Sequence, residues 1–278
     1  MKLSLVRVAF ALSSLTAASP TLAAQGNSAT LPHTVPVMME RLTTAEIRDA
    51  IHTGKTIVLI PSASTEATGP AIALGKHLVR AQYIAEHIAQ ELGNALVAPV
   101  MPFAPTTDES RFPGTVNLSA DAFSRVNEDV AESMVRTGFK YIIFMGDHDQ
   151  NQPLLRTLAS RLDEKHRADG VRVFFSSDSY AKTNKEIDEY LRANGYPPSR
   201  HGGVSDTSLT WAANPDYVHP DRIVVGAPVP PAGTPLSLGA IGIEGDPRRA
   251  SPELGKMFLG WKIKNGTAEI RNLVGTSK

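Results

Sequence analysis

The sequence contains no cysteine among its 278 residues. Disulfides, thiolate zinc ribbons and cysteine nucleophiles are therefore excluded, because each of them needs a thiol. The 28 lysines and arginines balance the 28 aspartates and glutamates, so the formal net charge is zero. A neutral chain gives no support for nucleic acid or an anionic membrane as a partner. Metal chemistry would have to use the eight histidines and the carboxylates.

Long hydrophobic runs are also missing, apart from a short one near the N-terminus. The segment MKLSLVRVAFALSSLTAASPTLAAQG begins with Lys2 and Arg7, continues with an apolar stretch and ends in small residues up to Ala24. This order is typical of a secretory signal peptide, and the stretch is too short to span a bilayer permanently. An N-terminal amphipathic helix is the alternative. We predict a signal peptide at residues 1–24 and a periplasmic or secreted protein of residues 25–278.

Short β-branched runs alternate with amphipathic stretches from Thr56 onward. Buried strands are predicted at residues 56–61, 95–100, 141–146 and 171–177. Helices are predicted between them, at residues 77–93, 120–138 and 153–170, where Ser119 can cap the second helix and Gly93 and Gly138 can end the first two. The chain shows no internal repeat and no clear linker. This pattern predicts a single α/β domain with a mostly parallel sheet and helices on both faces.

The pattern loosens beyond residue 177. Residues 182–195 predict a helix, and a short helix is expected to begin near Thr207. A Pro/Gly-rich loop follows from about Val225. Ser251 and Pro252 then open a last helix.

Two polar segments follow predicted strands, at the ends where open parallel sheets bind their ligands. The first, PSASTEATGPAIALGKH, contains Glu66 and His77, and the second, GDHDQN, contains His148. Two imidazoles and a carboxylate around a cation, with open positions left, form a catalytic type of metal site.

Each of these residues also has a simpler interpretation. Glu66 could be a solvated loop acid, and His77 could be a structural histidine near a helix start. Asp147 and Asp149 are typical turn or capping residues. His148 stands out, because a histidine in a Gly/Asp turn at a strand end is well placed to face a ligand.

Five segments, in the same order, resemble motifs of the creatininase family of metal-dependent amidohydrolases, which have an α/β fold. IPSASTEATGPAIALGKH resembles the segment P-x-G-S-x-E-x-H-G-P-H-L-P-x-x-T-D, and FPGTVNLS is similar to the F-P-G-T loop. MGDHDQN resembles the turn N-G-H-x-x-N. HGGVSDTSLTWAANPDYV resembles the segment H-A-G-x-x-E-T-S, and GDPRRASPELGKMF resembles the closing motif G-D-P-x-x-A. The resemblance extends from about Thr56 to about Met257.

The resemblance implies a metal site with altered ligands. The family usually holds two metals with a glutamate, a histidine, a bridging aspartate, a second histidine and a second glutamate. In this sequence these positions are Glu66, Thr68, His77, His148 and Gln150. Thr68 and Gln150 are poor ligands, and an imidazole cannot bridge two metals as a carboxylate does. We therefore expect one divalent ion, zinc or alternatively manganese or iron, on Glu66, His77 and His148. A site that has lost its metal is the alternative.

Three further residues are candidates for catalysis. The resemblance places His201, in the loop RHGGVSDTS, at the family histidine beside the substrate, and Asp206 at a carboxylate near the metals. A histidine there could transfer protons near neutral pH, whereas capping a helix is the simpler role for Asp206. Asp149 is another candidate base. Arg111 could contact an acidic substrate, although an exposed arginine is the simpler interpretation.

These observations predict a metal-dependent hydrolase that acts on a cyclic amide or a related C–N bond, or alternatively a C–O bond, of a small molecule. A metal-dependent lyase on a carbohydrate-like substrate and a non-catalytic small-molecule-binding relative are the alternatives. Creatinine is not expected as the substrate, because the metal ligands differ and the protein is expected to be exported. The resemblance also implies a homo-oligomer, and no nucleic acid or membrane partner is expected.

The mature protein should begin near Ala24 or Gln25, because the charged start and apolar stretch end there in small residues. N-terminal sequencing of the protein from its native host checks this. Soluble cytosolic protein that keeps Met1 would contradict it.

Overall fold

The computed structural model describes residues 36–231 and 233–275, so the predicted signal peptide lies outside the described residues. Four parallel strands form one sheet in the order β2–β1–β3–β4. The strands are β1 (Ile57–Ser62), β2 (Ala95–Val97), β3 (Tyr141–Gly146) and β4 (Arg172–Ser176).

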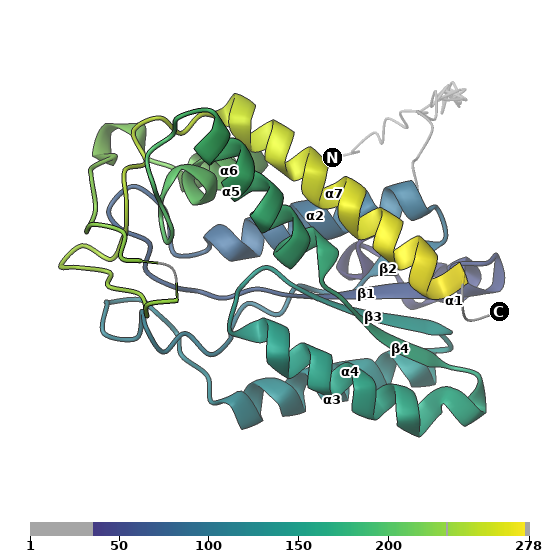
Figure 1. Ribbon diagram of the computed structural model, residues 1–278. Coiled ribbons are helices and arrows are strands. Elements are labelled where there is room, and N and C mark those ends of the chain that lie inside the picture. Colours follow the sequence, from purple (N-terminus) through teal and green to yellow (C-terminus); the bar gives the residue numbers. More distant parts are fainter. Residues whose placement is uncertain (1–35, 232, 276–278) are drawn as a thin grey trace, which may run out of the picture. The chain divides into compact units, whose positions relative to one another are not determined.

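Helices cover both faces of this sheet (Figure 1). α3 and α4 lie on one face; α2 and α7 lie on the other, with α5 and α6 packed against α7. This arrangement confirms the predicted α/β domain. The helices are α1 (Thr44–His52), α2 (Lys76–Leu92), α3 (Ala120–Thr137), α4 (Asn151–His166), α5 (Thr183–Ala193), α6 (Val204–Ala213) and α7 (Pro252–Gly275). Short helical turns add η1 (Met39–Arg41), η2 (Arg167–Asp169), η3 (Asp178–Lys182), η4 (Pro215–Tyr217) and η5 (Pro220–Arg222).

The sequence explains where the main elements begin and end. All six residues of β1 are buried, as a continuous apolar run in a parallel sheet requires. The Ser119 hydroxyl accepts a hydrogen bond from the Ala122 amide and caps α3. α2 and α3 stop at Gly93 and Gly138, whose φ angles of 78° and 109° lie in the left-handed region that glycine adopts most easily.

Apolar side chains fill the space between the sheet and each helical layer. On one face, Ile84 and Ile88 of α2 join Phe258 of α7 against the strands. On the other face, Phe123 of α3 and Leu155 of α4 lie in the second core cluster. Helices and apolar side chains therefore cover most of both faces of the sheet, and the strand ends are the place where a ligand can reach it.

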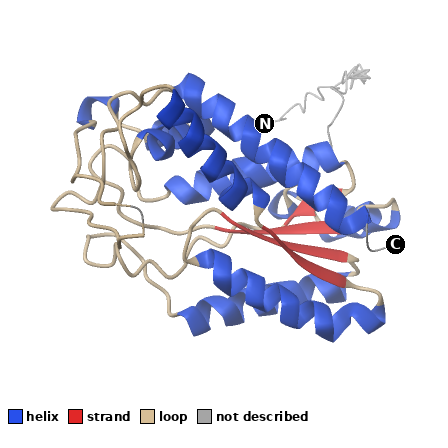
Figure 2. Ribbon diagram, viewed as in Figure 1, coloured by secondary structure: helices blue, strands red, loops and turns tan. Residues whose placement is uncertain are grey.

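The order of the strands creates a crevice between β1 and β3. The chain leaves β1 toward β2 on one side, and later continues from β3 to β4 on the other side. Ligands of open α/β sheets bind at this kind of reversal. Ser62 pairs with Gly146 at the carboxyl ends of the two strands. Figure 2 shows that the long loops gather at this end of the sheet, at the left of the view.

Three details differ from the sequence prediction. Helix α1 was not expected, although Thr43 and Glu46 form a capping box at its start. α6 begins at Val204, three residues before the expected position. A π-helical turn, η3, precedes α5. None of the helices in the described residues is long and apolar enough to cross a membrane.

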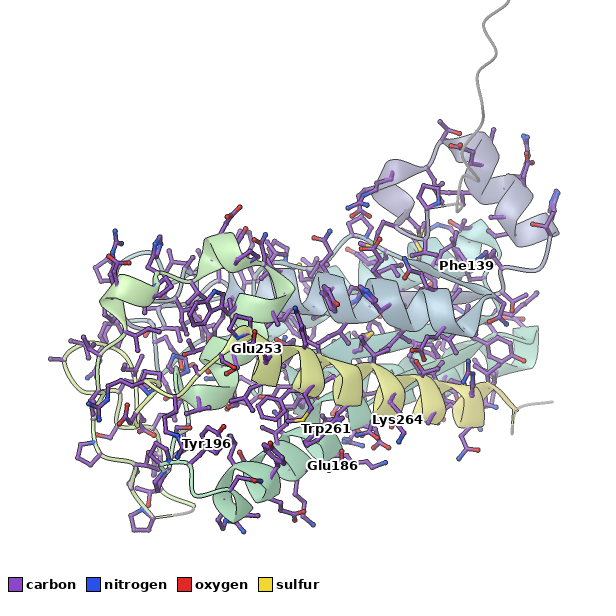
Figure 3. All side chains as sticks on the ribbon, turned by 90° about the horizontal axis from the view of Figure 1, so that it is seen from above. Phe139, Glu186, Tyr196, Glu253, Trp261 and Lys264 are labelled. Carbon is purple, nitrogen blue, oxygen red and sulfur yellow. The ribbon has the colours of Figure 1, made fainter. Side chains whose placement is uncertain are left out.

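α7 holds α5 and η3 in place beside the strand ends. The rings of Trp261 and Tyr190 meet edge to face, with centroids 5.6 Å apart. Asn265 donates a hydrogen bond to the Glu186 carboxylate at 2.7 Å, and Figure 3 shows Glu186 and Trp261 beside each other. The buried ammonium of Lys262 donates to the Ser179 carbonyl at 3.1 Å. These contacts fix one wall of the cavity described below.

The buried carboxylate of Asp163 joins α4 to β4, so Asp163→Ala should lower the free energy of unfolding by about 2–3 kcal/mol. Its oxygens accept hydrogen bonds from the Val173 amide at 2.9 Å and Arg172 Nε at 2.8 Å. The substitution leaves the buried Val173 amide without its acceptor. Denaturant unfolding measures the loss. The matched control, Asp169→Ala at an exposed position in η2, should change stability by less than about 0.5 kcal/mol.

The effect should depend on pH in a defined direction. Burial raises the pKa of Asp163, but hydrogen bonds from Arg172 and Val173 outweigh burial and hold the pKa below its ordinary value. The stabilisation is therefore present above the pKa of the unfolded state and disappears as the pH falls through the lower folded value. A stability difference between wild type and Asp163→Ala that persists unchanged in acid would contradict this account.

Candidate functional site

A cavity of about 230 Å³ lies at the carboxyl ends of β1 and β3. Its lining comes from α2, η3, α5 and α6 and from the loops that follow β1, β2, β3, α5 and α6. Glu66, His77, His148 and His201 all reach it. Residues that are up to 135 positions apart in the sequence therefore meet at the crevice that the strand order creates.

Glu66 is held by backbone contacts on both sides of its loop. Its own amide donates to the Leu74 carbonyl at 3.0 Å, and the next amide, Ala67, donates to the Thr115 hydroxyl at 3.0 Å. The Val116 amide donates back to the Thr65 carbonyl at 3.0 Å. The FPGTV segment thus fastens the loop that carries Glu66. The Glu66 side chain is completely buried, and its Oε2 accepts a hydrogen bond from Ser64 at 2.7 Å.

Both predicted histidine ligands point at the Glu66 carboxylate. His77 Nε2 lies 2.9 Å from Oε1, and His148 Nε2 lies 2.9 Å from Oε2. The three side chains are buried and could hold one metal ion together. Two imidazoles and a carboxylate suit zinc or manganese, so the residues present fit a divalent ion.

Asp147 fixes the orientation of the His77 ring. Its Oδ2 lies 2.9 Å from His77 Nδ1, and Glu66 Oε1 lies 2.9 Å from His77 Nε2. Because a carboxylate only accepts, a ring that binds a cation through Nε2 would keep its Nδ1 proton directed at Asp147. Nε2 is left for a cation, as in the carboxylate–histidine–metal arrangement of many metal sites. The other histidine differs, since Nδ1 of His148 is buried without a hydrogen-bond partner among the described residues.

Two buried cations frame this carboxylate cluster. Lys76 Nζ lies 3.3 Å from Glu66 Oε1 and 3.0 Å from Asp206 Oδ2. Arg80 donates to Asp147 at 2.8 Å and to Asp206 at 2.7 Å. Both cations project from the first turn and a half of α2, beside His77.

The buried cations and histidines around the carboxylates explain the shifts in the carboxylate pKa values. Burial raises the pKa of Glu66, but His77 and Lys76 outweigh burial and hold it well below its ordinary value. Burial also raises the pKa of Asp147, but the Arg80 guanidinium and His77 bring it down to about 2. Both carboxylates therefore stay charged and available to a cation at neutral pH.

A second group of possible metal ligands consists of Glu66, Glu109 and His201, all buried. His201 Nδ1 lies 3.6 Å from Glu109 Oε1 and 3.8 Å from Glu66 Oε1. Burial and the nearby Glu66 charge raise the pKa of Glu109 to about 7. Burial and the Lys76 charge lower the pKa of His201 to about 4, so its imidazole is neutral.

The remaining predicted catalytic residues occupy different environments. Asp149 lines the cavity with a 63% exposed side chain, and its Oδ1 lies 3.3 Å from His148 Nε2. Asp206 also lines the cavity, but Lys76, Arg80 and the Gly202 amide occupy its oxygens. It therefore positions its neighbours.

Three other positions singled out in the sequence lie outside both ligand groups. Thr68 Oγ1 is buried without a hydrogen-bond partner among the described residues. Gln150 Oε1 accepts a hydrogen bond from the Thr107 amide at 3.4 Å. Arg111 is exposed and donates to the Gly239 carbonyl at 2.9 Å, outside the cavity lining.

Sequence reasoning missed Lys76, Arg80 and Glu109. Lys76 and Arg80 are four residues apart, so one helical face carries both on either side of His77, and this spacing was a usable signal. Glu109 gave no such signal, because it is one acid in the loop before FPGTV and only the fold brings it to His201.

Comparisons with known proteins identify relatives of this chain. The sequence profile of the creatininase family, described as creatinine amidohydrolase, matches residues 40–269. The creatinine amidohydrolase of Pseudomonas putida is 25% identical over 244 residues, which cover 80% of this chain and 92% of that protein. A mycofactocin precursor peptide peptidase of Mycolicibacterium smegmatis is 25% identical over 232 residues, which cover 79% of this chain and 85% of that protein.

Solved structures show the same fold. A creatininase described as the Mn form superimposes with a TM-score of 0.73 at 22% identity, covering 85% of this chain and 98% of the other. A mutant creatininase of Zn–Zn type gives a TM-score of 0.74 at 23% identity, covering 85% and 97%. Because the family profile spans most of the sequence, the chain belongs to the creatininase family of amidohydrolases.

Proposed function

We propose that this creatininase-family hydrolase cleaves an amide or related C–N bond of a small molecule, with a divalent ion on Glu66, His77 and His148. The observation that carries the proposal is the convergence of two imidazole Nε2 atoms on one buried carboxylate inside the cavity. The names of the two relatives support it, since an amidohydrolase and a peptidase both cleave C–N bonds. The solved creatininases of Mn form and of Zn–Zn type support a divalent metal.

A divalent ion at this position would act as a Lewis acid toward the substrate carbonyl and would lower the pKa of a water molecule. The chain supplies the orientation. Asp147 holds the His77 ring through Nδ1, and Arg80 in turn holds Asp147. Asp206 acts as a positioning residue, because it fixes Lys76 and Arg80 beside the cluster.

Proton transfer is assigned to Asp149 and His201. The exposed carboxylate of Asp149 lies beside His148 at the cavity, where it can accept a proton from the attacking water. Nδ1 of the neutral His201 faces the cluster and can accept a proton and pass it to the leaving nitrogen. The cavity is small and most of its lining residues are polar or charged, which favours a small polar substrate or the end of a peptide. Export and assembly into a homo-oligomer stay predictions.

The ligand assignment predicts that His77→Ala and His148→Ala lose the tightly bound ion while the chain stays folded. Losing a ligand should weaken metal affinity by more than the 10–100-fold that is typical of losing a supporting residue. Elemental analysis after gel filtration in metal-free buffer measures the bound ion, and circular dichroism checks the fold. Full metal occupancy in His77→Ala would show that His77 is a structural histidine.

His52→Ala, in exposed α1, is the control for both variants. His166 is not a suitable control. The residue is 8% exposed, and its Nε2 lies 2.9 Å from Glu132 Oε1. Replacing it would disturb packing between α3 and α4, whereas His52→Ala should leave both metal content and stability unchanged.

The proposed reaction predicts metal-dependent release of an amine or a ring-opened acid from a panel of cyclic amides, creatinine and short peptides. Asp149→Asn should lower kcat by about 10²–10⁴-fold, as loss of a general base does, with metal content unchanged. Asp108→Asn, an exposed acid outside the cavity lining, is the control. Turnover that survives removal of the metal would contradict the proposal, and an unsaturated product from a carbohydrate-like substrate would indicate the lyase alternative.

A further inference from the structure

We propose that Glu66, Glu109 and His201 form a second cation position, which shares the Glu66 carboxylate with the Glu66–His77–His148 group. Two carboxylate oxygens and one imidazole nitrogen would hold a divalent ion such as zinc or manganese there. The proposal goes beyond the proposed function, which requires a single ion. It does not depend on which bond the protein cleaves.

The tautomer of His201 supports this position. Its Nε2 lies 2.9 Å from the Ala67 carbonyl oxygen, which can only accept, so Nε2 carries the proton. The Nδ1 lone pair therefore points toward the oxygens of Glu109 and Glu66. A ring fixed by a backbone carbonyl at one nitrogen and open at the other is typical of a histidine that binds a metal.

The distances within this group fit an ion better than a hydrogen bond. His201 Nδ1 lies 3.6 Å from Glu109 and 3.8 Å from Glu66, beyond the range of an N–H···O hydrogen bond. Two ligands of a tetrahedral ion with bonds of about 2.1 Å lie about 3.4 Å apart. The three ligand atoms lie within 4.8 Å of one another, so the group must contract before it holds an ion. In the first group, by contrast, the histidines contact Glu66 at hydrogen-bond distance.

Glu109 is the carboxylate of this cluster that lacks a cation. It is 1% exposed, and its Oε2 has no hydrogen-bond partner among the described residues. No lysine or arginine nitrogen in the described part of the chain lies within 4.0 Å of it, whereas Lys76 or Arg80 contacts each of Glu66, Asp147 and Asp206. Burying an uncompensated carboxylate is costly. A divalent ion between Glu109 and His201 would remove that cost.

Glu66 can serve both positions because a carboxylate has two oxygens with several lone pairs. The second ion should bind more weakly than the first, since the first ion and the Lys76 ammonium already lie beside Glu66. Occupation of the second position would use the Nδ1 lone pair of His201. Asp149 would then remain as the proton acceptor.

The test is a titration of the metal-free, full-length mature protein with Zn²⁺ or Mn²⁺ alone, followed by calorimetry and elemental analysis. Wild type should bind two ions per chain, one tightly and one more weakly. Glu109→Gln, which keeps the shape and removes the charge, should keep the tight ion and weaken the second by at least 10-fold. Asp188→Asn removes the same charge from the lining of the same cavity and should keep both ions.

Two further measurements keep the test decisive. Added metal should raise the melting temperature of Glu109→Gln less than that of wild type, because the variant binds the second ion more weakly. Anomalous diffraction from Zn²⁺-loaded crystals should show a peak bounded by Glu66, Glu109 and His201. Wild-type binding of a single ion that Glu109→Gln does not affect would overturn the second position. So would two ions bound equally well by Glu109→Gln. A single ion lost in Glu109→Gln would support this position and refute the first.

Discussion

The fully buried carboxylate of Glu66 is the constraint on which the site depends. An isolated carboxylate in the interior would be strongly destabilising, so every neighbouring element must supply a compensating group. The loop after β1 provides the Ser64 hydroxyl, α2 provides Lys76 and His77, and the turn after β3 provides His148. The crevice between β1 and β3 allows these segments to converge, and it exists because the strand order reverses there.

The groups that compensate the buried charge of Glu66 are themselves paired with further charged groups. Lys76 joins Glu66 to Asp206, Arg80 joins Asp206 to Asp147, and Asp147 returns to His77. Removing one member of such a network leaves its partner buried and unpaired, which typically costs more than the pair contributes. The network therefore makes the geometry of His77 dependent on α2 as a whole. It also explains why the carboxylate of Asp206, a residue expected to be catalytic, accepts hydrogen bonds from both cations.

Much of the fold was predictable, because buried strands and helices have regular patterns of apolar residues in the sequence. The four strands and the helices at 77–93, 120–138 and 153–170 were all expected, since apolar runs and Gly or Ser end signals mark them directly. α1 was missed because it is only nine residues long and contributes one buried residue, Ala50. The segment from 177 to 251 was hard to divide, because its π-turn packs against α7 and its loops bond to distant segments, as the His219 amide does to the Ala71 carbonyl.

The site was predictable only where a motif marked it. Glu66, His77 and His148 follow strands or begin a helix, so the topology alone could bring them together. The four-residue spacing of Lys76 and Arg80 predicts that they share one face of α2. It does not indicate which groups that face contacts. Glu109 could not be predicted as a ligand. Its role depends on its closeness to His201, which is 92 residues later in the sequence, and on the lack of a lysine or arginine beside it among the described residues.

The altered ligand positions gain a physical explanation from these contacts. Thr68 and Gln150 replace a histidine and a glutamate of the family pattern, so neither position offers an imidazole or a carboxylate to an ion. His77 stands where the family has a bridging carboxylate, so it can bind one ion but cannot join two. Any shared ligand must then be a different carboxylate. Glu66 has one oxygen beside His148 and the other facing His77 and His201, which makes it the residue that can take over the bridging role.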